Sequence, residues 1–486
     1  MPTELGPISS APRQLRPEVQ VRVTNGEIEL VDLSTSLVVD VAVQGSLEQL
    51  LADDEVWDGL KELGLAADGA SRAEIIQRQR QFNQESRAER WADFLKRCLS
   101  TRHYARHAAR LTGADDGLAG FITTKDQLRA APEDFVFDKI NSARGLEDGS
   151  VGLATSSGTT GERLQVFGDP WLLELPLHFR PWGDGPARRV LFTTPRCMGS
   201  ECHLVDSETT DRTRPDGSVF LQSVANPFSM TREFVKKAVD EIDAIEPNIL
   251  MVNAVYLHAL VRGAKRFGLR IRAPKVILSS YQYLSKITRR VLEEEFQCPV
   301  LQHYSASDVG GCRIALECEH GHLHVREDHV FVDIVDGAGQ PVPSGAVGRV
   351  AVSTVGNRVL GLLRYTLGDL ASAPPTNGDH VCALALWPTL ELHGRERDVV
   401  TVNGQQVTTK MFDDWISEIS GIEFYQCRQA SDDTFNLAVV VDDAAFAGDA
   451  DLSRRFAQRW DGASVRVQIR QRIDPEMSLK FSFLNR

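Results

Sequence analysis

The sequence lacks long apolar runs. None of its 486 residues lies in a stretch approaching the roughly 20 consecutive apolar residues that a membrane-spanning helix requires. Its first residues, MPTELGPISS, also lack the basic and apolar regions of a secretory signal peptide. These two absences predict a cytoplasmic protein without a membrane partner.

An excess of positive charge is missing as well. Lys and Arg total 54 against 67 Asp and Glu, which gives a formal net charge of −13. An acidic surface offers no general attraction to nucleic acid, so nucleic acid is not expected as a partner. Any site for an anion such as ATP must therefore be a local feature.

Cysteine is too sparse for a disulfide scaffold. The eight cysteines are scattered along the chain, whereas disulfide-stabilised domains are short and cysteine-dense. In a reducing compartment, cysteines grouped with histidines more often bind a metal ion. The length itself favours two to four domains.

Residues 1–72 are predicted to form a small accessory module. Strand-like runs at 19–23, 27–31 and 37–43 surround the turn residues Asn25 and Gly26, which favours a hairpin-rich module followed by short helices. An edge of such a sheet could receive an extended peptide or another partner. The alternative is a contact surface between two copies of the chain in a homodimer.

The remaining chain divides into a large and a small part. Residues 73–392 begin with charged helical sequence, and then short apolar runs such as VLFTT and KVILSS alternate with helical stretches such as KITRRVLEEEF. This alternation predicts an α/β fold with layered sheets in several subdomains. Residues 393–486 contain strands and helices of their own and are predicted to form a small, mobile α+β lid. The sequence contains no internal repeat.

A loop rich in glycine and hydroxyl groups follows the apolar run VGLA. Backbone N–H groups and hydroxyls of such a loop can bind phosphate oxygens. It is not a Walker A loop, because no lysine follows the second glycine in the required arrangement. Taken alone, the composition is more typical of a surface turn than of a phosphate site. The candidate phosphate-binding residues are Ser156, Ser157, Gly158, Thr159, Thr160 and Gly161.

Four further segments occur in a recognisable order. They are FITTKDQLRAAP at 121–132, HYSASDVGG at 303–311, LLRYTLGDLA at 362–371 and GRERDVVTVNGQQV at 394–407. Together with SSGTTG they resemble the motifs of the adenylate-forming superfamily, and specifically its phenylacetate-CoA ligase branch. The resemblance covers roughly residues 75–486. It implies a large adenylation domain with a C-terminal lid and the activation of a small acid by ATP.

The resemblance also implies a role for individual residues. Asp369 would bind the ribose hydroxyls, and Arg395 would add positive charge near the ribose and phosphates. Asp308 stands where most members carry a glutamate that binds magnesium, and Lys480 would bridge the substrate carboxylate and the α-phosphate. The residues expected to line the nucleotide and acyl pocket are Tyr304, Ser305 and Ser307.

A zinc site is a further candidate. Cys318 and His324 form a Cys-x5-His pair, and His380 and Cys382 add a His-x-Cys pair. Two cysteines and two histidines suit a closed tetrahedral zinc site, and many ligases of the resembled branch have cysteines in similar places. The alternative is a set of surface histidines beside buried cysteines. The candidate substitute ligands are Cys312, His320 and His322.

Three departures from the family pattern concern the substrate and the acceptor. Glu162 and Arg163 replace the usual Lys-Pro after the phosphate loop, and Arg397 replaces the first acidic residue of the lid hinge. The usual Gly-Ala-Glu-Pro element reads Ser-Tyr-Gln-Tyr at 280–283. These changes leave adenylation better supported than thioester formation with CoA.

Three functions are consistent with these patterns. The first is conversion of an aryl or arylalkyl acid to its acyl-AMP and then to a CoA thioester, with ATP and Mg²⁺ as cofactors. The second keeps adenylation but transfers the acyl group to an amine or a carrier peptide, or instead uses ATP to diazotise an aryl amine with nitrite. The third is a binding protein without chemistry, which the joint presence of Asp369, Arg395 and Lys480 disfavours.

Overall fold

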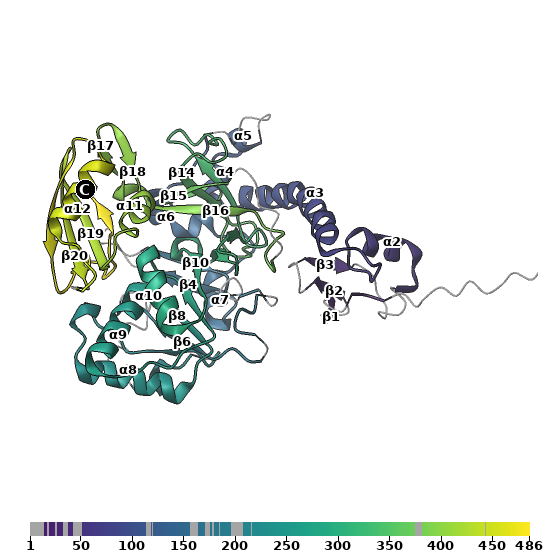
Figure 1. Cartoon of the computed structure of the whole chain (residues 1–486). Coiled ribbons are helices and arrows are strands. Elements are labelled where there is room, and N and C mark those ends of the chain that lie inside the picture. Colours follow the sequence, from purple (N-terminus) through teal and green to yellow (C-terminus); the bar gives the residue numbers. More distant parts are fainter. Residues whose placement is uncertain are drawn as a thin grey trace, which may run out of the picture. The chain divides into compact units, whose positions relative to one another are not determined.

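The computed structural model describes most of the chain. The described residues are 14–16, 19–24, 27–32, 37–41, 51–112, 118, 120–155, 164–170, 175–176, 179–183, 185–195, 208–214, 216–374, 382–442 and 444–486. Contacts divide the chain into a smaller unit, drawn from 1–93, 175–180 and 378–388, and a larger unit that holds the remainder (Figure 1). The domain boundaries predicted after residues 72 and 392 stay predictions.

The smaller unit contains an antiparallel three-stranded sheet. Its strands β1 (Val19–Thr24), β2 (Glu27–Asp32) and β3 (Val38–Val41) pair in chain order, close to the predicted runs. Helix α2 (Asp54–Glu62) begins where the Asp53 side chain accepts the N–H of Val56, a normal N-cap. Helix α3 (Arg72–Leu99) starts in this unit and ends in the larger one. Ile28, Leu30 and Leu60 are buried here.

The larger unit holds the remaining described elements. Its α-helices are α4 (Arg102–Ala105), α5 (Ala108–Leu111), α6 (Lys125–Ala130), α7 (Ser142–Asp148), α8 (Arg232–Ile245), α9 (Ala254–Phe267), α10 (Lys286–Phe296), α11 (Thr409–Ile416) and α12 (Asp449–Arg459). Its short 3-10 helices are η1 (Pro132–Phe135), η5 (Thr210–Arg212), η6 (Pro227–Ser229), η7 (Ser307–Val309) and η8 (Glu396–Asp398).

Strands of this unit form one large sheet and several small ones. Those of the large sheet are β6 (Arg189–Phe192), β7 (Val219–Phe220), β8 (Ile249–Val252), β9 (Val276–Ser279), β10 (Val300–Ser305), β11 (Arg313–Glu317), β12 (Leu323–Val325), β13 (Phe331–Val335), β14 (Gly348–Ser353), β15 (Tyr365–Ser372) and β16 (Thr389–Arg395). The others are β4 (Gly152–Thr155), β5 (Gln165–Gly168), β17 (Val400–Val402), β18 (Gln405–Val407), β19 (Ile422–Ser431), β20 (Thr434–Val441), β21 (Ser464–Ile469) and β22 (Leu484–Asn485).

The large sheet has a parallel half and an antiparallel half. Among the described residues its order is β13-β14-β15-β16-β12-β11-β10-β9-β8-β6-β7, with parallel pairing from β10 to β7 and antiparallel pairing from β13 to β10. Helices α8, α9 and α10 lie beside the parallel half (Figure 1). Val235, Val239 and Ile242 of α8 recur at helical spacing and are buried in the core of this half. Strand β10 joins the two halves.

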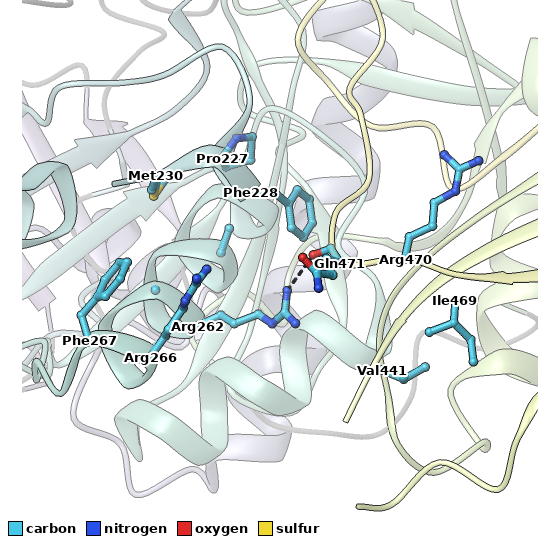
Figure 2. A pocket seen from close by; sticks show the side chains of 12 residues that line it. Pro227, Phe228, Met230, Arg262, Arg266, Phe267, Val441, Ile469, Arg470 and Gln471 are labelled. Atoms are coloured by element: carbon cyan, nitrogen blue, oxygen red, sulfur yellow. Dashed lines mark hydrogen bonds between the residues drawn. The ribbon is translucent and has the colours of Figure 1, made fainter. Parts of the chain in front are cut away.

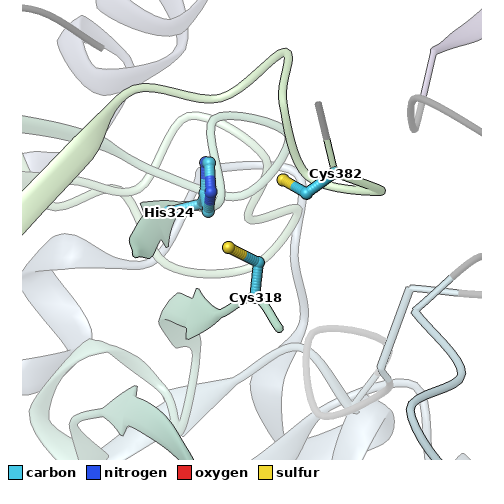
Figure 3. A group of neighbouring side chains, drawn as sticks. All are labelled: Cys318, His324 and Cys382. Atoms are coloured by element: carbon cyan, nitrogen blue, oxygen red, sulfur yellow. The ribbon is translucent and has the colours of Figure 1, made fainter. Parts of the chain in front are cut away.

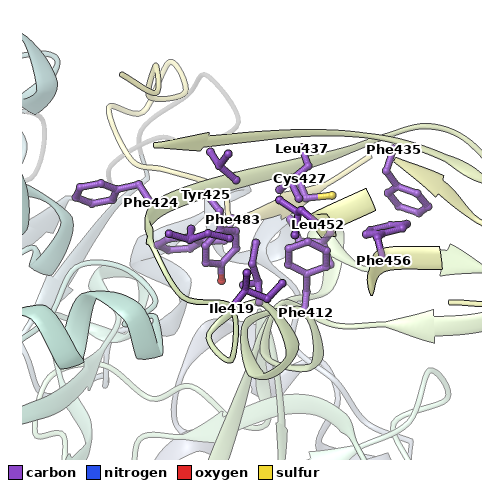
Figure 4. Close-up of a cluster of buried hydrophobic side chains, with 14 of the residues drawn as sticks. Phe412, Ile419, Phe424, Tyr425, Cys427, Phe435, Leu437, Leu452, Phe456 and Phe483 are labelled. Carbon is purple, nitrogen blue, oxygen red and sulfur yellow. The ribbon is translucent and has the colours of Figure 1, made fainter. Parts of the chain in front are cut away.

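The chain from β17 to β22 forms a compact subdomain that we call the lid. Its sheet has the order β21-β20-β19-β22, and α11 and α12 pack on it. Figure 4 shows aromatic residues of its core, such as Phe412 of α11 and Phe456 of α12. Phe412 also stacks on Trp460, with ring centroids 5.4 Å apart. The prediction of an α/β fold with layered sheets and a small α+β lid is confirmed. Within the described segments, no helix is both long and apolar enough to cross a bilayer.

Candidate active site

Asp369 and Arg395 meet across two neighbouring strands. Asp369 on β15 lies directly opposite Arg395 on β16, and Arg395 Nε is 2.9 Å from Asp369 Oδ1. The other carboxylate oxygen accepts a hydrogen bond from the hydroxyl of Tyr304 on β10, at 2.7 Å. The nearby carboxylate raises the pKa of Arg395, and burial together with that carboxylate raises the pKa of Tyr304 well above its usual range. The structure thus brings three predicted site residues together.

Asp308 forms a second polar centre. It lies on η7, directly after β10, and is 8% exposed. Its Oδ2 accepts hydrogen bonds from Lys125 Nζ at 2.8 Å and from the Tyr365 hydroxyl at 2.9 Å. Tyr365 lies on β15, the strand that also carries Asp369. Burial and the Asp308 carboxylate raise the pKa of Tyr365. Neither Lys125 nor Tyr365 is among the predicted site residues, although they lie in the motifs at 121–132 and 362–371.

The predicted phosphate loop, from Ser156 to Gly161, lies outside the described residues, as does Arg163. Its flanking strands β4 and β5 are described and pair in antiparallel fashion, with Thr155 opposite Gln165. The loop therefore connects the strands of a hairpin. A Cβ atom on Gly168 of β5 would lie 2.7 Å from the carbonyl oxygen of Gly310, so glycine permits the hairpin to approach the segment that carries Asp308.

Ser305 and Ser307 follow Tyr304 along the same segment. The Ser305 hydroxyl lies 3.4 Å from that of Ser280, in the element that replaces the usual Gly-Ala-Glu-Pro. Tyr281 in this element has φ = +72°, which is strained for a residue with a side chain. Tyr283 packs partly buried against the lid core. The element is therefore in contact with both Ser305 and the lid.

Lys480 lies in a turn near the C-terminus. The N–H of Glu476 donates to the carbonyl oxygen of Lys480 at 2.8 Å, which closes the turn. The next backbone N–H, that of Phe481, donates to Gln282 Oε1 at 3.3 Å. The structure thus places the Lys480 segment of the lid against the 280–283 element of the large sheet's subdomain.

A buried carboxyl group on the lid also contacts that subdomain. Asp413 on α11 is fully buried, and its oxygens accept hydrogen bonds from the Lys286 N–H at 2.9 Å and from the Tyr425 hydroxyl at 2.7 Å. Burial raises the pKa of Asp413 to about 6, against the opposing effect of these hydrogen bonds. The lid is therefore held by a carboxyl group that titrates near neutrality.

Ionisation of the Asp413 carboxyl group should lower the free energy of unfolding as the pH rises. A carboxyl group whose pKa is raised from 3.8 to about 6 keeps its proton in the folded chain where the unfolded chain has lost it. The free energy of unfolding should therefore fall between about pH 4 and pH 6 by about 2–3 kcal/mol from this group. The Asp413→Asn variant should lack this contribution in thermal unfolding scans from pH 4 to 7.5. The exposed Asp432→Asn variant is the control, and equal pH profiles for the three proteins would contradict the assignment.

The zinc candidates are partly described. Cys318, which directly follows β11, and His324 of β12 belong to the larger unit, and Cys382 belongs to the smaller unit. All three are buried, and they are residue types that can hold a metal ion (Figure 3). The fourth candidate, His380, lies outside the described residues.

A pocket of about 590 Å³ opens between α9 and the lid strands. Figure 2 shows Arg262 and Arg266 of α9 on one side and Arg470, after β21, on the other. Arg262 donates to the carbonyl oxygen of Gln471 at 3.2 Å and pairs with Glu423 at 2.7 Å. Phe228, Met230, Phe267 and Ile469 add apolar surface. None of the predicted site residues lines this pocket.

The fold resembles that of a solved CoA ligase. The structure resembles 2-hydroxyisobutyryl-CoA ligase in the postadenylation state in complex with R3-HIB-AMP, with a TM-score of 0.60 over 82% of this chain and 88% of that one. At 14% identity, this likeness shows the fold alone.

Sequence comparison finds similarity to phenylacetate-coenzyme A ligases. The chain is 24% identical over 198 residues to a phenylacetate-coenzyme A ligase of Pseudomonas putida, a match that covers 39% of this chain and 44% of the relative. It is 28% identical over 208 residues to that of Thermus thermophilus, which covers 39% and 45%. The matches thus span less than half the length of these relatives. No family model matches the chain.

Proposed function

We propose that this protein uses ATP to activate a small carboxylic acid as its acyl-AMP. The observation that carries the proposal is that Tyr304 of β10, Asp369 of β15 and Arg395 of β16 meet, although they are 26 to 91 positions apart in the sequence. The carboxylate of Asp369 would accept hydrogen bonds from the ribose hydroxyls, and Tyr304 would lie beside the adenine. The acid is proposed to be an aryl or arylalkyl acid.

Magnesium would be held at Asp308. Lys125 and Tyr365 both donate hydrogen bonds to Oδ2 of this carboxylate. Oδ1 is therefore the oxygen proposed to ligate the ion. A bound Mg²⁺ would screen the charge of the triphosphate. Lys125 adds a second positive charge on the same side, and Lys480 would neutralise the charge that develops between the substrate carboxylate and the α-phosphate.

A substrate panel tests this proposal. Pyrophosphate and AMP would be measured from ATP and Mg²⁺ with a set of aryl and arylalkyl acids, each with and without CoA, and with nitrite plus aryl amines as a parallel arm. Acid-dependent pyrophosphate release supports adenylation, and AMP release that also requires CoA supports the thioester step. Acid-dependent pyrophosphate release that does not change when CoA is added favours an amine or carrier peptide as acceptor. Pyrophosphate that depends on nitrite and an amine favours diazotisation.

The arginine-lined pocket supports CoA as the acceptor. CoA combines phosphates with an apolar arm, and the pocket combines three arginines with aromatic and aliphatic side chains. Loss of both Arg266 and Arg470 should raise the KM for CoA about 10- to 100-fold, because each arginine would form charge-assisted hydrogen bonds with phosphate. Acid-dependent pyrophosphate release should not change. The control is Arg232→Ala, which removes an exposed arginine of α8. If steady-state kinetics gave the same KM for CoA in all variants, the proposal would be contradicted.

We also propose a structural zinc ion held by Cys318, His324, His380 and Cys382. The burial of the three described candidates and their thiol and imidazole chemistry support it. The purified protein should contain about one zinc ion per chain by elemental analysis, and Cys318→Ala should lose it. Cys427→Ala removes a buried cysteine of the lid and should retain the zinc. Zinc-free wild-type protein from zinc-supplemented cells would rule out this site.

Residues 1–72 are proposed to recognise a peptide or another partner. The described sheet in this region ends in β1 on one side and β3 on the other, so an extended segment could pair with either edge. A contact between two copies of the chain is the alternative, which sedimentation of the full chain would detect.

A further inference from the structure

Lys480 is presented by a strained turn. Leu479, the residue before it, has φ = +62°, a left-handed conformation that costs a residue with a side chain of order 1 kcal/mol. The Leu479 N–H donates to the Glu476 carbonyl oxygen and the Glu476 N–H to that of Lys480, both at 2.8 Å. A strained turn persists only where its surroundings hold it, so the contacts of this segment decide where Lys480 lies.

The peptide groups on both sides of Lys480 are held by the large sheet's subdomain. Before it, the carbonyl oxygen of Leu479 lies 3.3 Å from the hydroxyl of Tyr256 on α9. After it, the N–H of Phe481 donates to Gln282 Oε1 at 3.3 Å. The Phe481 side chain packs against the cores of both the lid and the parallel half of the sheet. Lys480 is thus fixed from outside the lid.

Gln282 is itself rigidly oriented. Its Oε1 also accepts a hydrogen bond from Asn253 Nδ2 at 3.0 Å, and Asn253 caps α9 through its own Oδ1. Because Gln282 Oε1 receives two N–H donors, the assignment of its oxygen and nitrogen is determined by the bonds. The remaining atom, Nε2, is buried and has no hydrogen-bond partner among the described residues. A buried donor of this kind is costly unless an acceptor reaches it.

We infer that Gln282 is a positioning residue for Lys480. Its Oε1 accepts the Phe481 N–H and so fixes the turn that carries Lys480 in the lid position seen here. Its Nε2 would donate a hydrogen bond to an oxygen of the bound acid or nucleotide. The inference rests on the proposed function in assigning the reaction to Lys480. The placement of the turn is a structural claim that can be tested without catalysis.

Two substitutions separate the roles of the two atoms. Gln282→Leu removes both, whereas Gln282→Glu keeps an acceptor for the Phe481 N–H and removes the donor. The matched control is Gln426→Leu, because Gln426 Nε2 donates to the carbonyl oxygen of Ser482 at 3.0 Å from within the lid. It supports the same segment without joining it to the large sheet's subdomain.

Hydrogen exchange and kinetics provide the readouts. Gln282→Leu should speed amide exchange in residues 476–482 at least tenfold and lower kcat for acid-dependent pyrophosphate release about 10- to 100-fold. Because it also removes Nε2, it should raise the KM for the acid or ATP as Gln282→Glu does. Gln282→Glu should keep the slow exchange but raise the KM for the acid or ATP. Gln426→Leu should retain the wild-type kcat.

The outcomes distinguish failure of this inference from failure of the proposed function. Exchange in residues 476–482 that is no faster in Gln282→Leu than in Gln426→Leu would overturn the inference, whatever the activity. Wild-type protein that releases no acid-dependent pyrophosphate would instead refute the proposed function, while the exchange data would still test the placement of the turn. If Gln282→Leu does not fold, Gln282→Asn, which is one methylene too short to reach Phe481, replaces it in the same comparison.

Discussion

Replacing Lys480 with alanine is expected to lower acid-dependent pyrophosphate release by about 100- to 1,000-fold. The proposed role of the ammonium group is to neutralise charge that develops only as the carboxylate attacks the α-phosphate, so its loss should affect kcat far more than ATP binding. Single-turnover measurements with ATP in excess would give the rate of this step. Calorimetric titration with ATP should show binding within about threefold of wild type.

The control for this prediction is Lys236→Ala. Lys236 lies on α8, is 60% exposed and forms an ion pair with Asp240 of the same helix. Its loss should leave pyrophosphate release unchanged. If Lys480→Ala retained wild-type pyrophosphate release, the assignment of Lys480, and with it the role of Gln282, would be wrong.

Replacing Asp369 with asparagine is expected to weaken ATP binding about 10- to 100-fold. The carboxylate has two acceptor oxygens, whereas the amide has one acceptor and one donor, which would face the hydroxyl of Tyr304 or the guanidinium of Arg395. The variant thus loses acceptors for the ribose hydroxyls and also the charge that orients Arg395. Titration with ATP under conditions without the acid substrate measures this effect directly.

Asp333→Asn is the matched control. Asp333 on β13 also pairs with an arginine in the antiparallel half of the sheet. Its partner is Arg364, the residue before β15, whose Nε lies 3.2 Å from Asp333 Oδ2. Its substitution should change stability but not the affinity for ATP. Equal losses of affinity in the two variants would show that Asp369 acts through the sheet rather than through the nucleotide.

Much of the secondary structure could be predicted from local patterns. The run KITRRVLEEEF coincides with helix α10, and the strands expected within residues 393–486 include β20 and β21. Local signals sufficed because apolar spacing and capping residues such as Ser285 act within one turn. The charged helical sequence predicted at the start of residues 73–392 forms more than one helix, since Thr101 caps a new helix after α3 ends at Leu99.

The partners within the site could not be predicted in this way. Lys125 reaches Asp308 across 183 positions of sequence, and Gln282 reaches Phe481 across 199. Which strands become neighbours depends on the packing of the whole sheet, and no local pattern encodes it. The motifs predicted that Asp369, Arg395 and Tyr304 serve one site, and the register of β15 with β16 explains why Asp369 lies opposite Arg395. The roles of the phosphate-loop residues stay predictions.

Isotope transfer tests the central claim most directly. The acid would be supplied with ¹⁸O in both carboxylate oxygens, together with ATP, Mg²⁺ and CoA or another acceptor, and the AMP would be analysed by mass spectrometry. Attack of the carboxylate on the α-phosphorus releases pyrophosphate, and later cleavage of the acyl C–O bond leaves one carboxylate oxygen on the phosphate. The account predicts AMP that carries one ¹⁸O atom from the acid. AMP without the label, or the release of ADP and phosphate in place of AMP and pyrophosphate, would contradict it.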